Sequence, residues 1–320
     1  MTAQSAAQFD KAIRKTRVNA MHFCVFSYNR GHFLRNCIAS IERCVNEPAI
    51  TVFDDDSDDP ETRVILDEIA RRHEVRQAAA DSKATHKCGG LYGNMQAALD
   101  SAAADNLLCL VQDDTQLVRP LDDTDLGNIH SFFANDSKAA FLQSAFLLAI
   151  NRQRNESITT FNADRSCYYR ARGKQSVGVH FSAVSICHTQ RLHDAQWRFA
   201  SRERDNDEQA AKLFGKMGFM RDPFVAWLPN VPAYRGKIKT IALKHAERRR
   251  KCGLYPIEIL SEQANNAFRS RDAERALPIA EDYLTLSAGR SVEKPWTIYP
   301  LQGSSLLKLA NRLELKLRGR

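Results

Sequence analysis

The sequence of 320 residues lacks several features that define common protein classes. No Gly-x-Gly-x-x-Gly motif follows its first apolar segment and no Gly-Lys-Ser/Thr loop occurs, which argues against dinucleotide-dependent dehydrogenases and P-loop NTPases. The longest nearly apolar run, Ala139 to Ile150, is interrupted by Gln143 and Ser144 and is too short to cross a bilayer. The first residues, MTAQSAAQFDKAIRKTRV, lack the apolar core of a signal peptide, so we expect a cytoplasmic protein.

The eight cysteines show no zinc-knuckle or redox-motif spacing, and we expect most of them to be reduced thiols in small core sites. Hydrophobic residues make up 43% of the chain, enough for a sizeable core and too many for a disordered protein. The net charge of +8 is compatible with phosphorylated ligands or an anionic membrane. We predict no nucleic-acid partner.

Apolar segments of strand length alternate with helical stripes in the first part of the chain. Strands are expected over residues 21–26, 49–53, 75–77 and 107–111. The segment from His32 to Val45 places its apolar residues on one helix face, and Pro60 stands where a first helical turn tolerates proline. This repetition predicts an α/β fold, with a mostly parallel sheet and helices on both faces.

The segment from Leu107 to Val111 is the one around which the candidate site is organised. This apolar run ends in Gln112, Asp113 and Asp114, so two carboxylates follow a core strand directly. Ligands of open α/β sheets bind outside the carboxyl ends of the strands. Hard oxygen ligands on a rigid strand suit Mg²⁺ or Mn²⁺, whereas an isolated Asp-Asp pair is also typical of a solvated turn.

The alternation weakens after Pro120. A long buried strand is expected over residues 141–150, another strand within residues 177–186, and a short strand over residues 224–228. Residues 202–207, with the sequence RERDND, are expected to form a charged loop ahead of a helix over residues 208–217. We divide the chain into a lead-in over residues 1–20, a catalytic domain over residues 21–243 and a helical C-terminal region over residues 244–320.

Within the C-terminal region, residues 257–286 are expected to form two helices that dock on the catalytic domain or on a partner. The last segment, SSLLKLANRLELKLRGR, places leucines on one helical stripe among basic residues. Such a helix can lie in the interface of an anionic membrane. Its leucines can equally pack against the catalytic domain or a second subunit.

Four motifs, in this order, resemble those of family 2 glycosyltransferases with the GT-A fold, over about the first 235 residues. They are Ser27-Tyr28-Asn29-Arg30, Asp54-Asp55-Asp56-Ser57, Gly89-Gly90-Leu91-Tyr92-Gly93-Asn94 and Gln112-Asp113-Asp114. A later family signature falls on Asn206-Asp207. The sequence departs from the family pattern at four places: Asp56 replaces a glycine, Gln112 and Asn206 replace acidic residues, and no histidine occurs in Pro232-Ala233-Tyr234-Arg235.

The resemblance implies an inverting hexosyltransferase that moves a sugar from a nucleotide-diphosphate sugar, with UDP favoured, to a glycan or lipid-linked glycan in surface polysaccharide synthesis. Asp114 and Asp113 would hold Mn²⁺ or Mg²⁺ beside the diphosphate, and Asp207 would be the general base. The predicted nucleotide-binding residues are Ser27, Tyr28, Arg30, Asp54, Asp55, Asn94 and Asp113. Tyr28 would stack on the base, and Asp54 would accept a hydrogen bond from a uracil imide N–H.

Two other functions remain compatible with these residues. A sugar-nucleotidyltransferase also places carboxylates and a metal beside a nucleotide, although the sequence lacks the basic Gly-rich first loop of such enzymes. A non-catalytic carbohydrate-binding or scaffold protein on the same fold would fit the changes at Asn206 and at the missing histidine.

Overall fold

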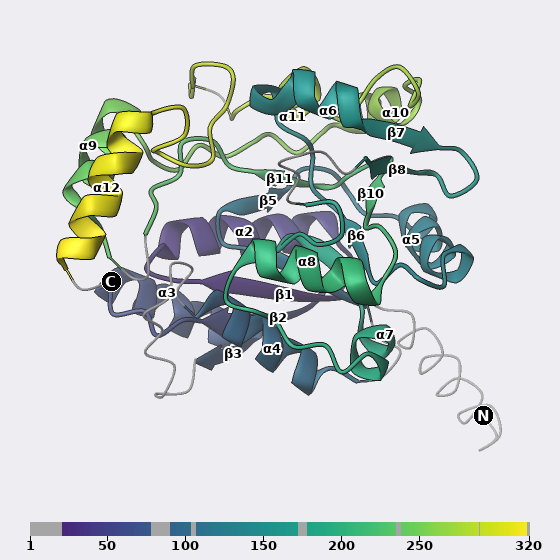
Figure 1. Ribbon diagram of the computed structural model, residues 1–320, viewed down its shortest axis with the longest axis horizontal. Helices are drawn as coiled ribbons and strands as arrows, with labels where there is room; N and C mark the ends of the chain where they lie inside the picture. The colour runs from purple at the N-terminus through teal and green to yellow at the C-terminus, as the bar shows by residue number, and fades with distance from the viewer. Residues whose placement is uncertain are drawn as a thin grey trace.

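The computed structural model describes residues 21–77, 90–103, 107–171, 178–234, 238–287 and 289–318. A nine-stranded sheet lies at its centre, with the order β3-β2-β1-β4-β9-β6-β10-β8-β7 (Figure 1). The pairings make β9 and β8 antiparallel to their neighbours, so the other seven strands run in one direction. The expected α/β architecture with a mostly parallel sheet is confirmed.

The first four strands lie close to their expected positions: β1 (Met21–Ser27), β2 (Ala49–Asp54), β3 (Glu74–Gln77) and β4 (Leu107–Gln112). The helices among and after them are α2 (Gly31–Cys44), α3 (Pro60–Ala70), α4 (Leu91–Ser101) and α5 (Asp123–Asn135). Local sequence signals set several helix starts. Asp59 caps α3 by accepting the Thr62 N–H ahead of Pro60, and Asp122 and Asp125 form a reciprocal capping box on α5.

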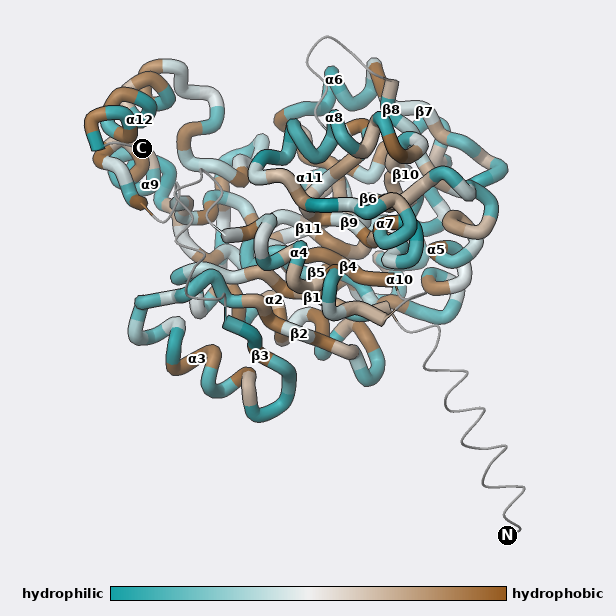
Figure 2. The backbone as a smooth tube through the Cα atoms, turned by 60° about the horizontal axis from the view of Figure 1, so that its bottom comes forward, coloured by the Kyte–Doolittle hydropathy of each residue, from teal (hydrophilic) through white to brown (hydrophobic). Residues whose placement is uncertain are grey.

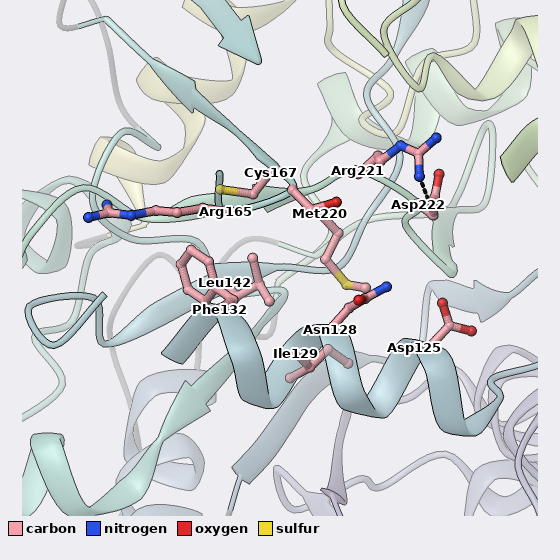
Figure 3. Close-up of a pocket in the computed structure, with 11 residues that line it drawn as sticks. Asp125, Asn128, Ile129, Phe132, Leu142, Arg165, Cys167, Met220, Arg221 and Asp222 are labelled. Carbon is pink, nitrogen blue, oxygen red and sulfur yellow. Dashed lines mark ion pairs between the residues drawn. The ribbon is translucent and has the colours of Figure 1, made fainter. Parts of the chain in front are cut away.

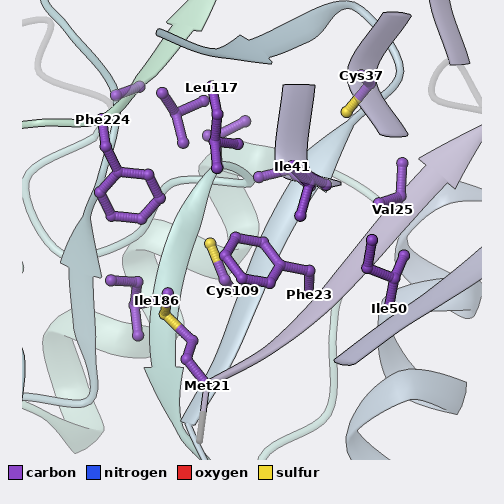
Figure 4. Close-up of a cluster of buried hydrophobic side chains, with 14 of the residues drawn as sticks. Met21, Phe23, Val25, Cys37, Ile41, Ile50, Cys109, Leu117, Ile186 and Phe224 are labelled. Atoms are coloured by element: carbon purple, nitrogen blue, oxygen red, sulfur yellow. The ribbon is translucent and has the colours of Figure 1, made fainter. Parts of the chain in front are cut away.

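Successive residues of the central strands point to opposite faces of the sheet and pack into two apolar layers. Phe23 and Val25 point to the layer that contains α2, α3 and α5, where Ile38 and Ile41 are buried (Figure 4). Phe26 and other alternating residues point to the opposite layer, which contains α4, α7 (Thr189–Asp194) and α8 (Glu203–Leu213). Helices therefore cover both faces of the sheet, as expected.

The second half differs from the sequence-based prediction. The long strand expected over residues 141–150 is only β6 (Phe141–Gln143), followed by isolated bridges and the 3₁₀ turn η1 (Ala149–Asn151). The strand expected within residues 177–186 begins later, as β9 (Ser185–His188). The remaining strands and helix of this region are α6 (Arg152–Ile158), β7 (Thr159–Asn162), β8 (Cys167–Arg170) and β10 (Gly218–Met220).

The prediction of a charged loop over residues 202–207 is wrong, because α8 begins at Glu203 and contains most of that segment. Glu203 and Asp205 lie in the first turn, where the helix dipole favours negative charge. The apolar periodicity does not show this start, since the first turns of α8 are polar. The correction places Asp207 on a helix instead of a loop.

Most of the C-terminal region packs against the layers formed by residues 21–243. A small sheet pairs β11 (Val225–Trp227) with β5 (Thr115–Leu117), and a third apolar cluster there joins Val118 and Phe146 to Ile257, Phe268 and Trp296. The two-helix unit expected over residues 257–286 contains α10 (Glu262–Arg269) and only the short α11 (Ala280–Tyr283). The docking that we expected for this unit occurs on residues of the preceding segment, 21–243.

The expected domain boundary between residues 243 and 244 lies inside α9 (Ile241–Arg249). Helix α12 (Ser305–Leu317) packs against α9 at one side of the molecule, where Thr240 Oγ1 donates to Asn311 Oδ1 at 2.7 Å (Figure 2). No helix in the described ranges is long and apolar enough to span a membrane. The lead-in over residues 1–20, Cys88, Gly89 and Arg235 lie outside the described residues, and the seven described cysteines are free thiols.

Candidate functional site

Three adjacent parallel strands deliver the candidate residues to one edge of the sheet. Ser27 pairs with Asp54 at the ends of β1 and β2, and Phe26 pairs with Gln112 at the end of β4. Backbone hydrogen bonds continue this alignment past the strands, from Asp55 N–H to Ser27 O at 2.9 Å and from Asp113 N–H to Phe26 O at 3.0 Å. The motifs singled out in the sequence therefore meet at the carboxyl ends of β1, β2 and β4.

Arg30 joins the two carboxylates that follow β4. Its Nε donates to Asp113 Oδ2 at 3.1 Å, its Nη2 donates to Asp113 Oδ1, and its Nη1 donates to Asp114 Oδ2 at 2.9 Å. Nη1 also donates to the carbonyl oxygen of Pro232 at 3.3 Å. The two aspartates raise the pKa of Arg30, against the lowering effect of its burial, so the guanidinium stays charged.

Asp113 is completely buried. Ser27 Oγ donates to its Oδ2 at 3.3 Å and the Tyr28 N–H does so at 3.4 Å, in addition to the two contacts with Arg30. Burial raises the pKa of Asp113, Arg30 opposes that shift, and Asp114 adds to it. Because both oxygens already have donors, Asp113 is placed as the anchor of Arg30. The geometry gives it no open position as the second metal ligand that the sequence suggested.

Asp114 has the open position that Asp113 lacks. Its Oδ2 pairs with Arg30, whereas its buried Oδ1 accepts no hydrogen bond from the described residues. A buried carboxylate oxygen without a donor fits a divalent ion. No group of three or more His, Cys, Asp or Glu side chains gathers as a cage in the described ranges, so phosphate oxygens and water would supply the other ligands.

The loop after β2 is held by its own acidic residues. Asp54 accepts the Ser57 N–H at 2.7 Å and the Ser57 hydroxyl at 2.6 Å, and its burial raises its pKa. Both oxygens thus organise the loop, and the predicted contact of Asp54 with a uracil base would require one of them to exchange partners. Asp56 has a φ of 58°, in the left-handed region, which accounts for the glycine at this position of the family motif.

Asp55 links this loop to the start of α4. Its Oδ2 accepts the Gly90 N–H at 2.7 Å. A side chain at residue 90 would not fit there, because an added Cβ would lie 2.1 Å from Asp55 Oδ1. Asn94 is buried in the same first turn of α4. The structure therefore groups Asp55, Gly90 and Asn94 at the start of α4.

Two tyrosines form an aromatic wall beside Arg30. The Tyr28 and Tyr234 rings lie edge to face, 5.2 Å apart, and Lys239 Nζ lies 4.8 Å from the centre of the Tyr234 ring. Burial raises the pKa of Tyr28 to about 12, so its phenol keeps its proton at neutral pH. Sequence reasoning missed Tyr234, because that segment was inspected only for a histidine. The order Pro-Ala-Tyr-Arg after the last strand was the available signal.

Asp207 organises a second loop. Its Oδ1 accepts the backbone N–H groups of Gly178, Val179, His180 and Phe181, at 3.2, 2.9, 2.8 and 3.1 Å. The Phe181 ring in turn lies 6.3 Å from the ring of Tyr92, in the first turn of α4. The loop held by Asp207 thus packs against α4 within the apolar layer on that face of the sheet.

Asn206, where the family motif has an acidic residue, has a structural role. It is fully buried, and its amide pairs with the backbone of Ala200 in both directions, at 2.7 and 2.9 Å. Its Nδ2 also donates to the Arg202 carbonyl oxygen at 3.0 Å. Asn206 therefore fixes the turn that precedes α8 and uses both ends of its amide to do so.

A pocket lies between α5 and strands β8 and β10, and none of its lining residues belongs to the carboxyl-end cluster (Figure 3). Its charged groups are neutralised by neighbours: Arg119 pairs with Asp125 at 2.8 Å, and Asp222 pairs with Arg271 at 2.6 Å. Arg119 also donates to the carbonyl oxygen of Pro223, so it joins α5 to the segment after β10, and Arg271 joins that segment to the C-terminal region. We therefore assign them to the stability of the fold.

No protein-family model matches the chain, and no curated protein matches its sequence. Among solved structures, residues 1–349 of S. aureus TarS match with 15% identity and a TM-score of 0.43, over 65% of this chain and 60% of that one. The same region of TarS in complex with UDP matches with a TM-score of 0.41. The mannosyltransferase PcManGT from Pyrobaculum calidifontis, in complex with GDP-Man and Mn²⁺, matches with 11% identity and a TM-score of 0.45, over 79% of this chain and 65% of that one. The chain thus spans less than two thirds of each of these structures.

Proposed function

We propose that this protein is an inverting glycosyltransferase with a GT-A fold, which moves a sugar from a nucleotide-diphosphate sugar to a hydroxyl group of a glycan or lipid-linked glycan. The observation that carries the proposal is the arrangement of Arg30 and Asp114. An arginine fixed by two aspartates and a carboxylate oxygen without a hydrogen-bond donor lie together at the carboxyl ends of adjacent parallel strands, where α/β sheets bind their ligands.

The leaving group of such a reaction is a nucleoside diphosphate, whose negative charge grows as the glycosidic bond breaks. Mn²⁺ or Mg²⁺, held by Asp114 Oδ1, would supply Lewis-acid stabilisation of that charge when bound. Arg30 adds a positive charge that is already in position, because Asp113 fixes its Nε and Nη2. Asp113 is therefore a positioning residue in this proposal, and Arg30 replaces it as the group that faces the diphosphate.

The tyrosine pair is the proposed place of the base. Tyr28 and Tyr234 present aromatic rings beside Arg30, and an aromatic face binds any nucleobase by stacking. Ser27, Asp54 and Asp55 support the two loops that frame this wall, and Asn94 lies in the first turn of α4 beside them. UDP remains the favoured nucleotide from the sequence resemblance.

Asp207 remains our proposed general base, acting on the acceptor hydroxyl. Its Oδ1 is committed to four backbone N–H groups, so Oδ2 is the oxygen that can take the proton. Holding the loop of residues 178–181 also fixes the orientation of that second oxygen. The same carboxylate would thus shape the acceptor side of the site and activate the acceptor.

A donor screen tests this function directly. The protein is mixed with Mn²⁺ and a panel of UDP- and GDP-sugars, and the release of nucleoside diphosphate is measured. Release should be abolished in Asp114→Asn, because the substitution removes a charge from the metal's first shell. Asp100→Asn, at an exposed surface pair with Arg198, is the matched control and should release diphosphate normally. Pyrophosphate release would instead indicate a nucleotidyltransferase, and neither release nor nucleotide binding would indicate a non-catalytic protein.

We also propose that α12 attaches the protein to the cytosolic face of an anionic membrane. Leu306, Leu309, Leu313 and Leu317 form an exposed row along the helix, and the outermost, Leu306 and Leu317, are 81% and 88% exposed. Ile241 at the start of α9 is also 71% exposed, and its N–H donates to Glu314 of α12. These five residues are most of the large exposed hydrophobic side chains in the described ranges.

The charges around this row favour a lipid surface over an apolar protein groove. Lys308, Arg312 and Lys316 on α12 and Lys244 on α9 are exposed, and each basic residue near an anionic surface adds about 1 kcal/mol. The exposure of the leucines does not match the alternative in which they pack on the catalytic domain.

Sedimentation with phosphatidylglycerol-containing liposomes measures the attachment. The row variant with Leu306, Leu309, Leu313 and Leu317 changed to serine should stay in the supernatant, while the intact protein sediments. Val64→Ser, at an isolated exposed apolar residue on α3, is the control and should sediment normally. Failure of the intact protein to bind at low salt, or a dimer in solution that the serine variant dissociates, would rule out membrane attachment.

A further inference from the structure

Arg170, the last residue of β8, is a partly buried cation with unusual surroundings. Its guanidinium lies over the ring of Phe219, 4.3 Å from the ring centre, and its Nη2 donates to Asn155 Oδ1 at 2.9 Å. Its Nε is buried and donates to no acceptor among the described residues. The stacking and the single amide contact hold the guanidinium in a fixed orientation while leaving part of its donor set unused.

No described carboxylate pairs with Arg170, and the neighbouring charges are positive. Burial, and after it the nearby Arg154, lower the pKa of Arg170 to about 10, so it remains charged at neutral pH. A guanidinium that is held in one orientation, is partly exposed and has no carboxylate partner among the described residues is suited to bind an oxyanion.

Arg119 and Arg271 show which hydrogen-bond acceptors a structural arginine has in this protein. Arg119 is fully buried and places its two terminal nitrogens on the two oxygens of Asp125, each at 2.8 Å. Arg271 pairs with Asp222 at 2.6 Å. Both arginines have a carboxylate and backbone oxygens as acceptors, whereas Arg170 has one side-chain amide.

Arg170 lies beside the loop that Asp207 organises. A Cβ added to Gly178 would meet Arg170 Nη1 at 3.7 Å, and the Gly178 N–H itself donates to Asp207 Oδ1. Gly178 has a φ of +84°, which favours glycine and leaves no side chain between the loop and the guanidinium. The uncompensated cation and the proposed base are thus held on two sides of the same short loop.

We propose that Arg170 forms an anion-binding subsite for the acceptor, which takes an oxyanion of the acceptor, either a phosphate or a carboxylate. The assignment of this ligand to the acceptor rests on the proposed glycosyltransferase function. Arginine suits this chemistry because its planar fork matches phosphate and carboxylate oxygens in pairs. Phe219 and Asn155 orient the fork before the ligand arrives, which reduces the entropy lost on binding.

The test measures binding without any donor, so its result is separate from that of the donor screen. Isothermal titration uses glycerol 1-phosphate and glucuronate as probes, with glycerol and glucose as their neutral counterparts. The intact protein should bind at least one charged probe and neither neutral one, and which charged probe binds identifies the oxyanion. Arg170→Met should weaken that binding about tenfold or more, because a charge-assisted contact is lost.

Two controls separate binding from structure. Arg198→Met removes an arginine from an exposed surface pair with Asp100 and should bind the probe as the intact protein does. Arg170→Met should keep its resistance to urea, because it removes a partly buried charge that has no carboxylate partner among the described residues, whereas a purely structural arginine would lose stability. If Arg170→Met does not fold, Arg170→Gln is judged by the same criteria. Absence of binding to both charged probes, or equal binding by the variant and the intact protein, would overturn the proposal.

Discussion

The pair formed by Arg30 and Asp113 gives the sharpest test of the site's electrostatics. Arg30→Met keeps an unbranched apolar stem and removes the cation that faces a completely buried carboxylate. Breaking a buried ion pair by removing one partner costs about 3–5 kcal/mol, because the remaining charge has no compensation. We therefore expect the free energy of unfolding, measured by urea titration with tryptophan fluorescence at pH 8, to fall by an amount in that range.

Arg35→Met is the matched control, since Arg35 lies on α2, one turn after Arg30. It pairs with Glu68 at 2.6 Å, but the two side chains are 46% and 43% exposed, so the loss should stay below about 1 kcal/mol. The double variant Arg30→Met, Asp113→Asn should recover part of the lost stability, because the unpaired charge is gone. Equal losses for Arg30→Met and Arg35→Met would contradict the reasoning.

The same variant has a defined pH dependence. Burial already raises the pKa of Asp113, and removing Arg30 takes away the interaction that opposes this shift. With a folded-state pKa above its unfolded value, Asp113 binds more protons in the folded state, so stability falls as pH rises through that window. The difference between Arg30→Met and the intact protein should therefore be smallest in acid and largest above the raised pKa.

Two further predictions address the loops. Gly90→Ala should weaken nucleotide binding, measured by titration with UDP, because its Cβ would displace Asp55; Gly93→Ala, which meets nothing within 4 Å, should leave binding unchanged and add up to about 1 kcal/mol of stability. Asp207→Asn should lower turnover by roughly a hundredfold or more with little change in stability, since its amide oxygen still accepts the loop N–H groups. Asp207→Ala should lose at least about 2 kcal/mol as well, because those N–H groups lose their acceptor. Normal turnover in Asp207→Asn would exclude the role as a base.

The first half of the fold was predictable because its signals are local and agree with one another. Short apolar runs, helix stripes and the caps at Asp59 and Asp122 are all visible in the sequence, and the resulting elements differ from expectation by one or two residues. The sequence also predicted that Asp54 and Asp113 lie close together, because parallel strands bring their carboxyl ends to the same edge of the sheet.

The second half depends on contacts between residues far apart in the chain. Beyond Gln143, Ala145 and Leu147 form single bridges to Val225 and Ile279 in place of a continuous strand, and no local periodicity predicts such partners. The polar start of α8 likewise has no apolar stripe to mark it.

The partners of the hydrogen bonds within the site could not be predicted from the sequence either. Asp113 and Asp114 are adjacent and have the same side chain. Arg30 contacts both oxygens of Asp113, whereas Oδ1 of Asp114 accepts no hydrogen bond from the described residues. In the same way, the four N–H groups on Asp207 come from a segment more than twenty-five residues earlier. Sequence reasoning could select these residues but could not tell which of their atoms are occupied.

The third apolar cluster has a consequence for how the protein is made. Val118, Phe146 and Leu228 are covered by Ile257, Phe268 and Trp296, so one wall of the unit formed by residues 21–243 is supplied by residues that are synthesised later. On the ribosome, the strands that carry the candidate site would emerge with this wall uncovered, and would complete their burial only after residue 296 has left the exit tunnel. A gene fragment that stops at residue 243 should therefore give aggregated protein, whereas one that stops after Gln302 retains the whole cluster and loses only α12.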